Sequence, residues 1–115
     1  RWSVDDMVEY AHSYGLEVLL EAHTAVEFHR ALASEADLVG INNRDLGTMK
    51  VDLDTTRRIL SEKLSPDRIV VSESGINSLA DIRALKKAGA KAFLVGTAIM
   101  SATDIARKVK ELVEA

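Results

Sequence analysis

Short apolar runs alternate with longer amphipathic segments along the chain. Four runs are nearly continuous in apolar residues, "VLLEAH" (18–23), "LVGIN" (38–42), "IVVSES" (69–74) and "AFLVG" (92–96). Runs of this length, rich in leucine and β-branched residues, are typical of parallel strands covered by helices. The pattern therefore predicts four buried strands.

The segments between these runs have helical periodicity. Each is expected to bury one apolar stripe: Val26, Ala31 and Leu32; Ile59, Leu60 and Leu64; Leu79, Ile82, Leu85 and Ala88; and Ile105, Val109 and Leu112. A further helix is predicted in "RWSVDDMVEYAHSYG", before the first strand. Helix starts are signalled by a hydroxyl and an acid three residues later, at Ser3/Asp6, Thr24/Glu27, Ser78/Asp81 and Ser101/Asp104. Glycine caps at Gly15 and Gly89 and a turn at Pro66 complete the boundaries.

The order helix, then strand–helix four times, predicts an α/β fold with parallel strands and right-handed crossovers. An open doubly wound sheet and part of a (β/α)8 barrel both fit this order. No linker interrupts residues 1–115, so we expect a single domain. Because Arg1 opens directly on a helix with no strand before it, we expect the chain to be a fragment, a processed piece or a designed protein.

Each predicted strand is apolar at its start and polar at its carboxyl end. In parallel α/β proteins ligands bind beyond these ends. The polar residues there are Glu21 and His23, then Asn42, Asn43 and Arg44, then Glu73, Ser74 and Gly75, and finally Gly96 and Thr97. We expect these four endings to form one polar rim, which is the strongest functional signal in the chain.

The two strand-end glutamates suit acid–base chemistry. Glu21 and Glu73 have apolar neighbours, and burial raises the pKa of a carboxyl group unless a cation or an amide donor offsets it. Such groups act as general acids or bases, or stabilise a cationic intermediate. The alternative is that each glutamate pairs with Arg44 or a lysine and only shapes the rim. The presence of two, beside Asn42 and Arg44, favours a functional role.

The strand-end glycines suggest an anion site. Gly75 and Gly96 each follow a strand, and a glycine loop that leads into a helix presents free N–H groups, to which Thr97 adds a hydroxyl. The alternative is that both glycines only permit tight turns. The pair at consecutive strand ends favours a phosphorylated substrate. The three histidines lack metal-ligand spacing, so no metal site is expected.

Composition narrows the function classes. A net charge of −3 argues against a general nucleic-acid or membrane-surface binder, and no apolar run is long enough to span a bilayer. The absence of cysteine excludes disulfides and thiolate metal sites and is compatible with a cytoplasmic enzyme.

The motifs "LLEAH", "GINNRDL", "VSESGI" and "FLVGTAIM", in this order and at these separations, resemble the indole-3-glycerol phosphate synthase family. The resemblance covers the whole chain but only the carboxyl-terminal half of the family's (β/α)8 TIM barrel, the helix after strand four and βα units 5–8. It implies a cytoplasmic carboxy-lyase of tryptophan biosynthesis that works without a cofactor. The substrate, 1-(2-carboxyphenylamino)-1-deoxyribulose 5-phosphate, closes to an indole with loss of carbon dioxide and water.

The resemblance also implies roles for individual residues. Glu21 would be the acid–base group of the dehydration, Asn42 would hold a substrate hydroxyl and Arg44 would lie near the anthranilate carboxylate. Glu73 and Ser74 would orient the substrate and support charge in the intermediate, and Gly75, Gly96 and Thr97 would bind the phosphate. Thr97 stands where the family commonly has serine or glutamate.

The family's catalytic lysines lie in the first half of its barrel, and no lysine here stands at a matching strand end. The resemblance therefore implies little activity for this chain alone. A half barrel also leaves two edge strands and an inner face unpaired. We expect it to pair with a second copy, as a two-fold homodimer of half-barrels, or with the complementary amino-terminal half. The alternatives are a self-associating half-barrel scaffold without activity and another phosphate-binding barrel enzyme, such as an isomerase of the histidine or tryptophan pathway.

Overall fold

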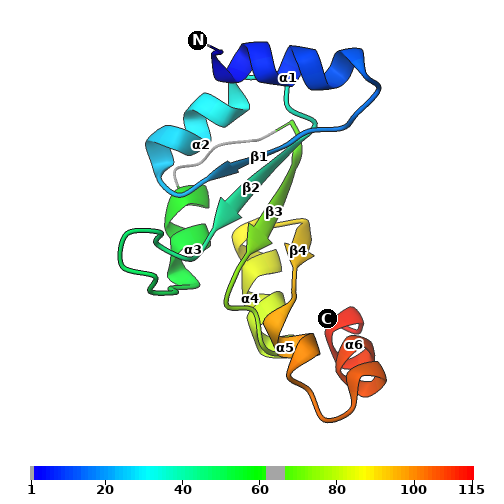
Figure 1. The fold of residues 1–115 in the computed structure, drawn as a ribbon. Coiled ribbons are helices and arrows are strands. Elements are labelled where there is room, and N and C mark those ends of the chain that lie inside the picture. Colours follow the sequence, from blue (N-terminus) through cyan, green and yellow to red (C-terminus); the bar gives the residue numbers. More distant parts are fainter. Residues whose placement is uncertain (1, 62–66) are drawn as a thin grey trace.

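The fold is a parallel four-stranded sheet with helices between the strands. The computed structural model describes residues 2–61 and 67–115, so the predictions for Leu64 and Pro66 lie outside the described residues. The strands run in the order β1-β2-β3-β4 (Figure 1). Their bounds are β1 (Leu19–Ala22), β2 (Leu38–Asn42), β3 (Ile69–Glu73) and β4 (Ala92–Leu94), which confirms the four predicted strands to within two residues at each end.

Helices precede the sheet and follow every strand. Their bounds are α1 (Val4–Ser13), α2 (Ala25–Leu32), α3 (Asp54–Leu60), α4 (Leu79–Ala88), α5 (Thr97–Met100) and α6 (Ile105–Val113). The chain ends lie at opposite ends of the molecule in Figure 1, on α1 and α6. Among the described residues, no helix has both the length and the apolar character that crossing a bilayer requires.

Strand order decides between the two architectures that fit the sequence. A doubly wound sheet reverses its strand order at a switch point. Here every strand pairs in parallel with the next one along the chain, without reversal. Sequential parallel order is the arrangement of βα barrels, and four strands correspond to part of such a barrel.

The apolar core lies on one face of the sheet. Phe28 from α2 and Ile41 from β2 are fully buried in the part that α2 and α3 form with β1, β2 and β3. Ile82, Leu85 and Leu112 bury a second part between α4, α6 and β4. Since side chains alternate along a strand, the residues between these core positions must point to the opposite face.

We call this opposite side of the sheet the inner face. The strand register assigns to it Leu19, Glu21, Leu38, Gly40, Asn42, Ile69, Val71, Glu73, Ala92 and Leu94. Three of its apolar members, Leu19, Ile69 and Leu94, are 43, 49 and 58% exposed. The inner face therefore presents apolar surface to solvent at both edges of the sheet.

Two of the predicted apolar stripes are wrong in part. Val26 is exposed and α2 buries Phe28 in its place, because two residues along a helix rotate a side chain to the other side, whereas Ala31 is buried as predicted. In α6 only Leu112 is buried, while Ile105 and Val109 are exposed. The neighbouring strand β4 has only three residues, so it offers α6 little sheet to cover.

Helix caps follow the predicted residues at three of four starts. Ser3 and Ser78 form complete capping boxes with Asp6 and Asp81. Thr24 caps α2, but Glu27 accepts a hydrogen bond from the His23 N–H (2.7 Å), one residue before the expected partner.

The fourth predicted cap, the pair Ser101/Asp104, is wrong. Asp104 itself caps α6. The hydroxyl of Ser101, which follows the end of α5, donates instead to the carbonyl of Thr97. Residues 101–104 form a turn after α5, so the final helix begins only at Ile105.

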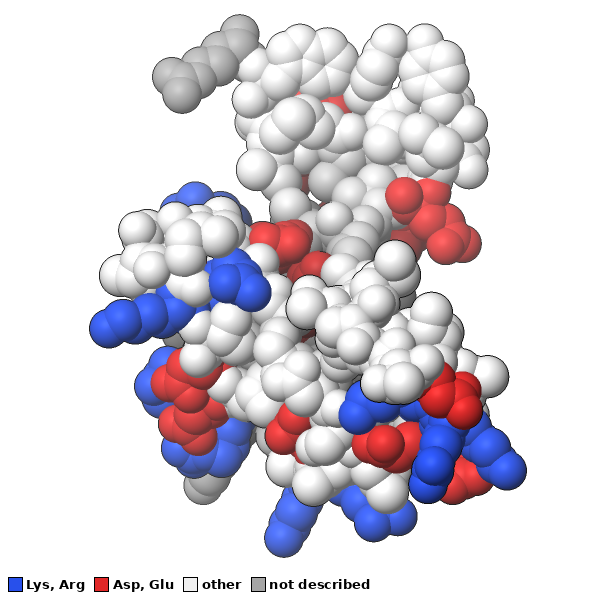
Figure 2. All heavy atoms as spheres, turned by 60° about the horizontal axis from the view of Figure 1, so that its bottom comes forward, with Lys and Arg blue, Asp and Glu red and all other residues white. Residues whose placement is uncertain are grey.

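Charged residues are distributed without a dominant sign. On the face drawn in Figure 2, acidic and basic side chains are interspersed over the lower half of the view, and no large basic patch forms there.

Candidate active site at the strand ends

The strand register brings three of the predicted site residues together. Asn42 of β2 pairs with Glu73 of β3, and Glu21 of β1 pairs with Gly40, two residues before Asn42 on β2. All three side chains belong to the inner face, at the carboxyl ends of neighbouring strands. The predicted rim is therefore formed by β1, β2 and β3.

A chain of hydrogen bonds connects this rim. The Asn42 amide donates to Glu21 Oε1 (3.0 Å), and its own oxygen accepts from the Ser74 hydroxyl (2.7 Å). The Arg44 backbone N–H donates to the same Asn42 oxygen (2.9 Å). These contacts hold the Asn42 amide in one orientation, with its N–H directed at the carboxylate of β1.

Glu73 is the buried acid of the rim. The residue is 4% exposed, and its Oε2 has no hydrogen-bond partner among the described residues. Burial raises the pKa of Glu73 to about 7, helped by the charge of Glu21 and a hydrogen bond with it, while His23 acts in the opposite direction. When the Glu73 carboxyl is protonated it no longer needs a donor, because its own O–H can donate a hydrogen bond to Glu21.

Gly40 provides the space that Glu73 occupies. A Cβ at position 40 would lie 2.2 Å from Glu73 Oε2 and 3.4 Å from Leu19 Cδ1. A glycine in the middle of a strand often marks a close approach of another group. Here that group is the carboxylate of the neighbouring strand.

Glu21 has a different environment from the one we predicted. Its side chain is 39% exposed, so the expected burial on β1 is wrong for this chain. His23 Nε2 lies 3.1 Å from Glu21 Oε1, without hydrogen-bond alignment, and His23 Nδ1 lies 3.4 Å from Glu27 Oε1. The two glutamates thus differ in exposure, which is the arrangement that separates an acid from a base.

The glycines open onto a cavity of about 770 Å³. Its lining includes Arg44, Ser74, Gly75, Asn77, Gly96 and Thr97. Gly75 has φ +78°, and a Cβ there would lie 2.2 Å from Val51 Cγ1, so both conformation and space require glycine. A Cβ at Gly96 would meet nothing within 4 Å, so Gly96 borders open space.

Arg44 forms no ion pair with Glu21 or Glu73 in the described residues. Its guanidinium donates to the Met49 carbonyl (2.9 Å), and its backbone forms an isolated antiparallel bridge with Val51. This bridge folds the loop between β2 and α3 over the strand ends, so that Val51 and Leu53 also line the cavity. Sequence reasoning missed both residues, because they lie in a loop that only the bridge brings to the site.

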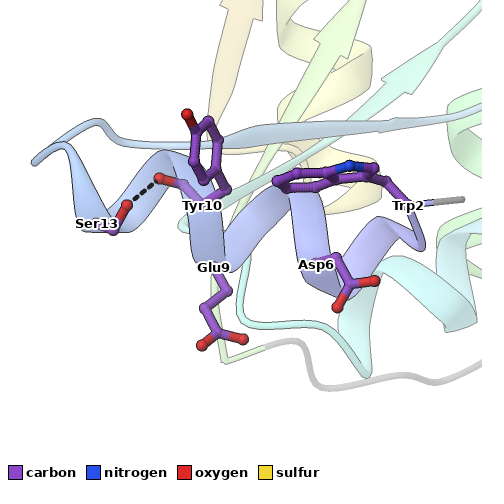
Figure 3. A pocket seen from close by; sticks show the side chains of 5 residues that line it. All are labelled: Trp2, Asp6, Glu9, Tyr10 and Ser13. Carbon is purple, nitrogen blue, oxygen red and sulfur yellow. Dashed lines mark hydrogen bonds between the residues drawn. The ribbon is translucent and has the colours of Figure 1, made fainter.

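A second hollow, of about 420 Å³, lies on α1. Figure 3 shows that its lining residues, Trp2, Asp6, Glu9, Tyr10 and Ser13, all come from this helix and the residue pair before it. The Trp2 and Tyr10 rings meet edge to face, 5.0 Å apart. Because one helix supplies the whole hollow, it does not bring together distant parts of the chain. The described residues contain no cluster of three or more metal-binding side chains.

Comparison with known proteins identifies the family. The family model for indole-3-glycerol phosphate synthase matches residues 2–112. The chain belongs to this family. An indole-3-glycerol phosphate synthase of Dehalococcoides mccartyi is 45% identical over 109 residues, which is 95% of this chain and 42% of the relative. Another, from Haloarcula marismortui, is 40% identical over 113 residues and is covered to 41%.

The chain therefore spans about two fifths of the length of these indole-3-glycerol phosphate synthases. Among solved structures, a thiamine phosphate pyrophosphorylase from Pyrococcus furiosus superposes with a TM-score of 0.75 at 24% identity, over 98% of this chain and 54% of that one. A second structure, described as native KDPGal, gives a TM-score of 0.71 at 18% identity and is covered to 53%. At these identities the likeness concerns the fold alone.

Proposed function

We propose that this chain is the carboxyl-terminal half of an indole-3-glycerol phosphate synthase, with its four strands as strands five to eight of a (β/α)8 barrel. In this proposal it carries the phosphate site and part of the catalytic rim. The observation that carries it is the rim itself, in which an exposed glutamate on β1 and a buried glutamate on β3 flank Asn42 of β2 beside a glycine-lined cavity.

The rim suits the dehydration that follows ring closure. Loss of water needs one group that takes up a proton and another that delivers one to the departing oxygen. Glu21 is partly exposed and accepts a hydrogen bond from the Asn42 amide, which suits the acid–base role. Glu73, whose pKa is raised to about 7 by burial and by Glu21, holds a proton near neutral pH. Asn42 and Ser74 supply further polar contacts for the substrate.

The cavity suits the phosphorylated end of the substrate. The first N–H groups of a helix have no intrahelical acceptor, and α5 begins at Thr97, directly beside Gly96 and the cavity. Gly75 also lines this cavity, next to Ser74. Arg44 also lines the cavity and would face the anthranilate carboxylate. No cofactor or metal is part of the proposed reaction.

The test is an indole-fluorescence assay with 1-(2-carboxyphenylamino)-1-deoxyribulose 5-phosphate. We expect no product from the chain alone, because the family's lysines are absent, and product when an amino-terminal half from a relative is added. Glu21→Gln in the complemented sample is the control and should remove the signal. Robust turnover by the chain alone, or turnover that survives Glu21→Gln, would contradict the proposed roles.

A self-associating half-barrel is the second candidate, and the exposed apolar residues of the inner face favour it. Two copies related by a two-fold axis would close eight strands and bury Leu19, Ile69 and Leu94. The complementary amino-terminal half would cover the same surface. Light scattering separates these cases, since a homodimer forms from the chain alone, whereas a monomer at micromolar concentration would argue against self-association.

A further inference from the structure

Asn43 lies directly behind the polar rim, one residue after β2, and is 2% exposed. Its backbone N–H donates to the Glu73 carbonyl (2.8 Å), and its backbone carbonyl accepts from the Asp52 N–H (2.9 Å). The main chain of this one residue therefore connects the end of β3 with the loop that folds over the cavity.

The side chain of Asn43 uses both of its donors and its oxygen in a buried network. Its amide nitrogen donates to the Ser72 hydroxyl and to the Ser74 carbonyl, both at 3.1 Å. Its oxygen accepts from the Thr56 hydroxyl (2.8 Å), which lies 2.8 Å from the Ser72 hydroxyl. Only an amide offers two donors and an acceptor in this space, because a carboxylate has no donor and a hydroxyl has one.

The Ser74 carbonyl matters because the backbone at Ser74 is unusual. Ser74 has φ +75° and Gly75 has φ +78°. The left-handed conformation is easy for glycine but unfavourable for serine. It is in this conformation that the Ser74 hydroxyl reaches Asn42 and that Gly75 lines the cavity. Asn43 holds the two consecutive carbonyls of Glu73 and Ser74, at the point where the backbone turns.

We propose that Asn43 is a positioning residue of the candidate site, whose amide keeps Ser74 and Gly75 in the left-handed conformation required by the rim and the cavity. Asn43 does not contact the cavity itself. The expected effect of Asn43 on phosphate affinity rests on the proposed function. The expected effect of Asn43 on the backbone conformation of Ser74 does not depend on the proposed function.

A purely structural role predicts something different. An asparagine that only completes the core would lower the free energy of unfolding when replaced and leave the Ser74 backbone as it is. Ser34 is the matched control, because it is also buried and its hydroxyl donates to Ala31 and accepts from the Ala36 N–H, but away from the rim. Ser34→Ala should lower stability without changing Ser74.

The experiment uses NMR of the labelled chain with inorganic phosphate as the probe. Backbone carbon shifts of Ser74 report its conformation, and a phosphate titration of the Gly75, Gly96 and Thr97 amides reports affinity. Asn43→Ala and the milder Asn43→Ser should both move the Ser74 shifts away from left-handed values and weaken phosphate binding on the order of fivefold. Because glycine adopts this conformation freely, the loss caused by Asn43→Ala should be much smaller in a Ser74→Gly background.

The outcomes are separable. Unchanged Ser74 shifts in both Asn43 variants would overturn the positioning role. An equal loss of affinity in the serine and glycine backgrounds would overturn it as well. If neither Asn43 variant folds, recovery of folding in the glycine background supports the proposal, and failure there overturns it. If the unsubstituted chain binds no phosphate, the proposed function fails, while the Ser74 shifts still decide the role of Asn43.

Discussion

Replacing Glu73 by glutamine should make the chain more stable at neutral pH and remove a specific pH dependence. Glu73 is 4% exposed, and burial together with Glu21 raises its pKa from an ordinary value of 4.5 to about 7. Between these two values the folded chain holds a proton that the unfolded chain releases. Stability from this group is therefore fully present below pH 4.5 and is lost as the pH rises through about 7.

The size of this effect follows from the two pKa values. The complete difference corresponds to about 3 kcal/mol, and most of it, about 2 to 3 kcal/mol, is lost between pH 5 and pH 8. Glutamine has the shape of the protonated acid and does not titrate. We therefore expect Glu73→Gln to be more stable than the unsubstituted chain by about 1 kcal/mol at pH 5 and by about 3 kcal/mol at pH 8.

Urea unfolding followed by circular dichroism between pH 5 and pH 8 measures this difference. Protein concentration must be held constant, because association would add to the apparent stability. Glu9→Gln, the same chemical change on the exposed side of α1, is the control and should follow the unsubstituted chain. Glu21→Gln removes the neighbouring charge and should shift the loss to lower pH. Curves for Glu73→Gln and the unsubstituted chain that stay parallel within about 0.5 kcal/mol would refute the reasoning.

Three further predictions concern the cavity, a helix end and the inner face. Gly75→Ala should lower the free energy of unfolding by at least about 2 kcal/mol, because the added Cβ would overlap Val51 and the residue has a positive φ. Gly96→Ala should change the free energy of unfolding by less than about 1 kcal/mol, because its Cβ would meet nothing within 4 Å. Urea unfolding of the two variants measures the difference. Arg68→Ala should lower the free energy of unfolding by about 2–3 kcal/mol, because the guanidinium donates to the carbonyls of Leu32, Ser34 (2.7 Å) and Ala36 (3.1 Å), at and after the end of α2. In thermal unfolding, Arg68→Lys should have an intermediate stability. A loss below about 0.5 kcal/mol for Arg68→Ala would contradict this role. Leu94→Asp should weaken self-association by about 100-fold in sedimentation experiments, since a two-fold dimer buries this side chain twice. Val113→Asp is the control and should have little effect, because Val113 is also apolar and exposed but lies on α6.

The elements and the family could be read from the chain alone, because both depend on local order. Apolar runs and hydroxyl–acid pairs predicted all four strands and three of four helix caps. The motifs around Glu21, Asn42 and Glu73 indicated the family that the comparison confirmed. Local rules failed where a neighbour decided the outcome, as in α6, where the short strand β4 left Ile105 and Val109 uncovered.

Only the tertiary structure distinguished between residues that look equivalent in sequence. Glu21 and Glu73 both end apolar strands, yet one is exposed and the other buried, because Gly40 on the strand between them leaves room for Glu73. Asn42 and Asn43 are adjacent, but alternation along the strand sends the first to the rim and the second into the network behind it. Burial and hydrogen-bond partners depend on which strands pair and in which register, and that long-range choice is decided by packing the sheet against its helices.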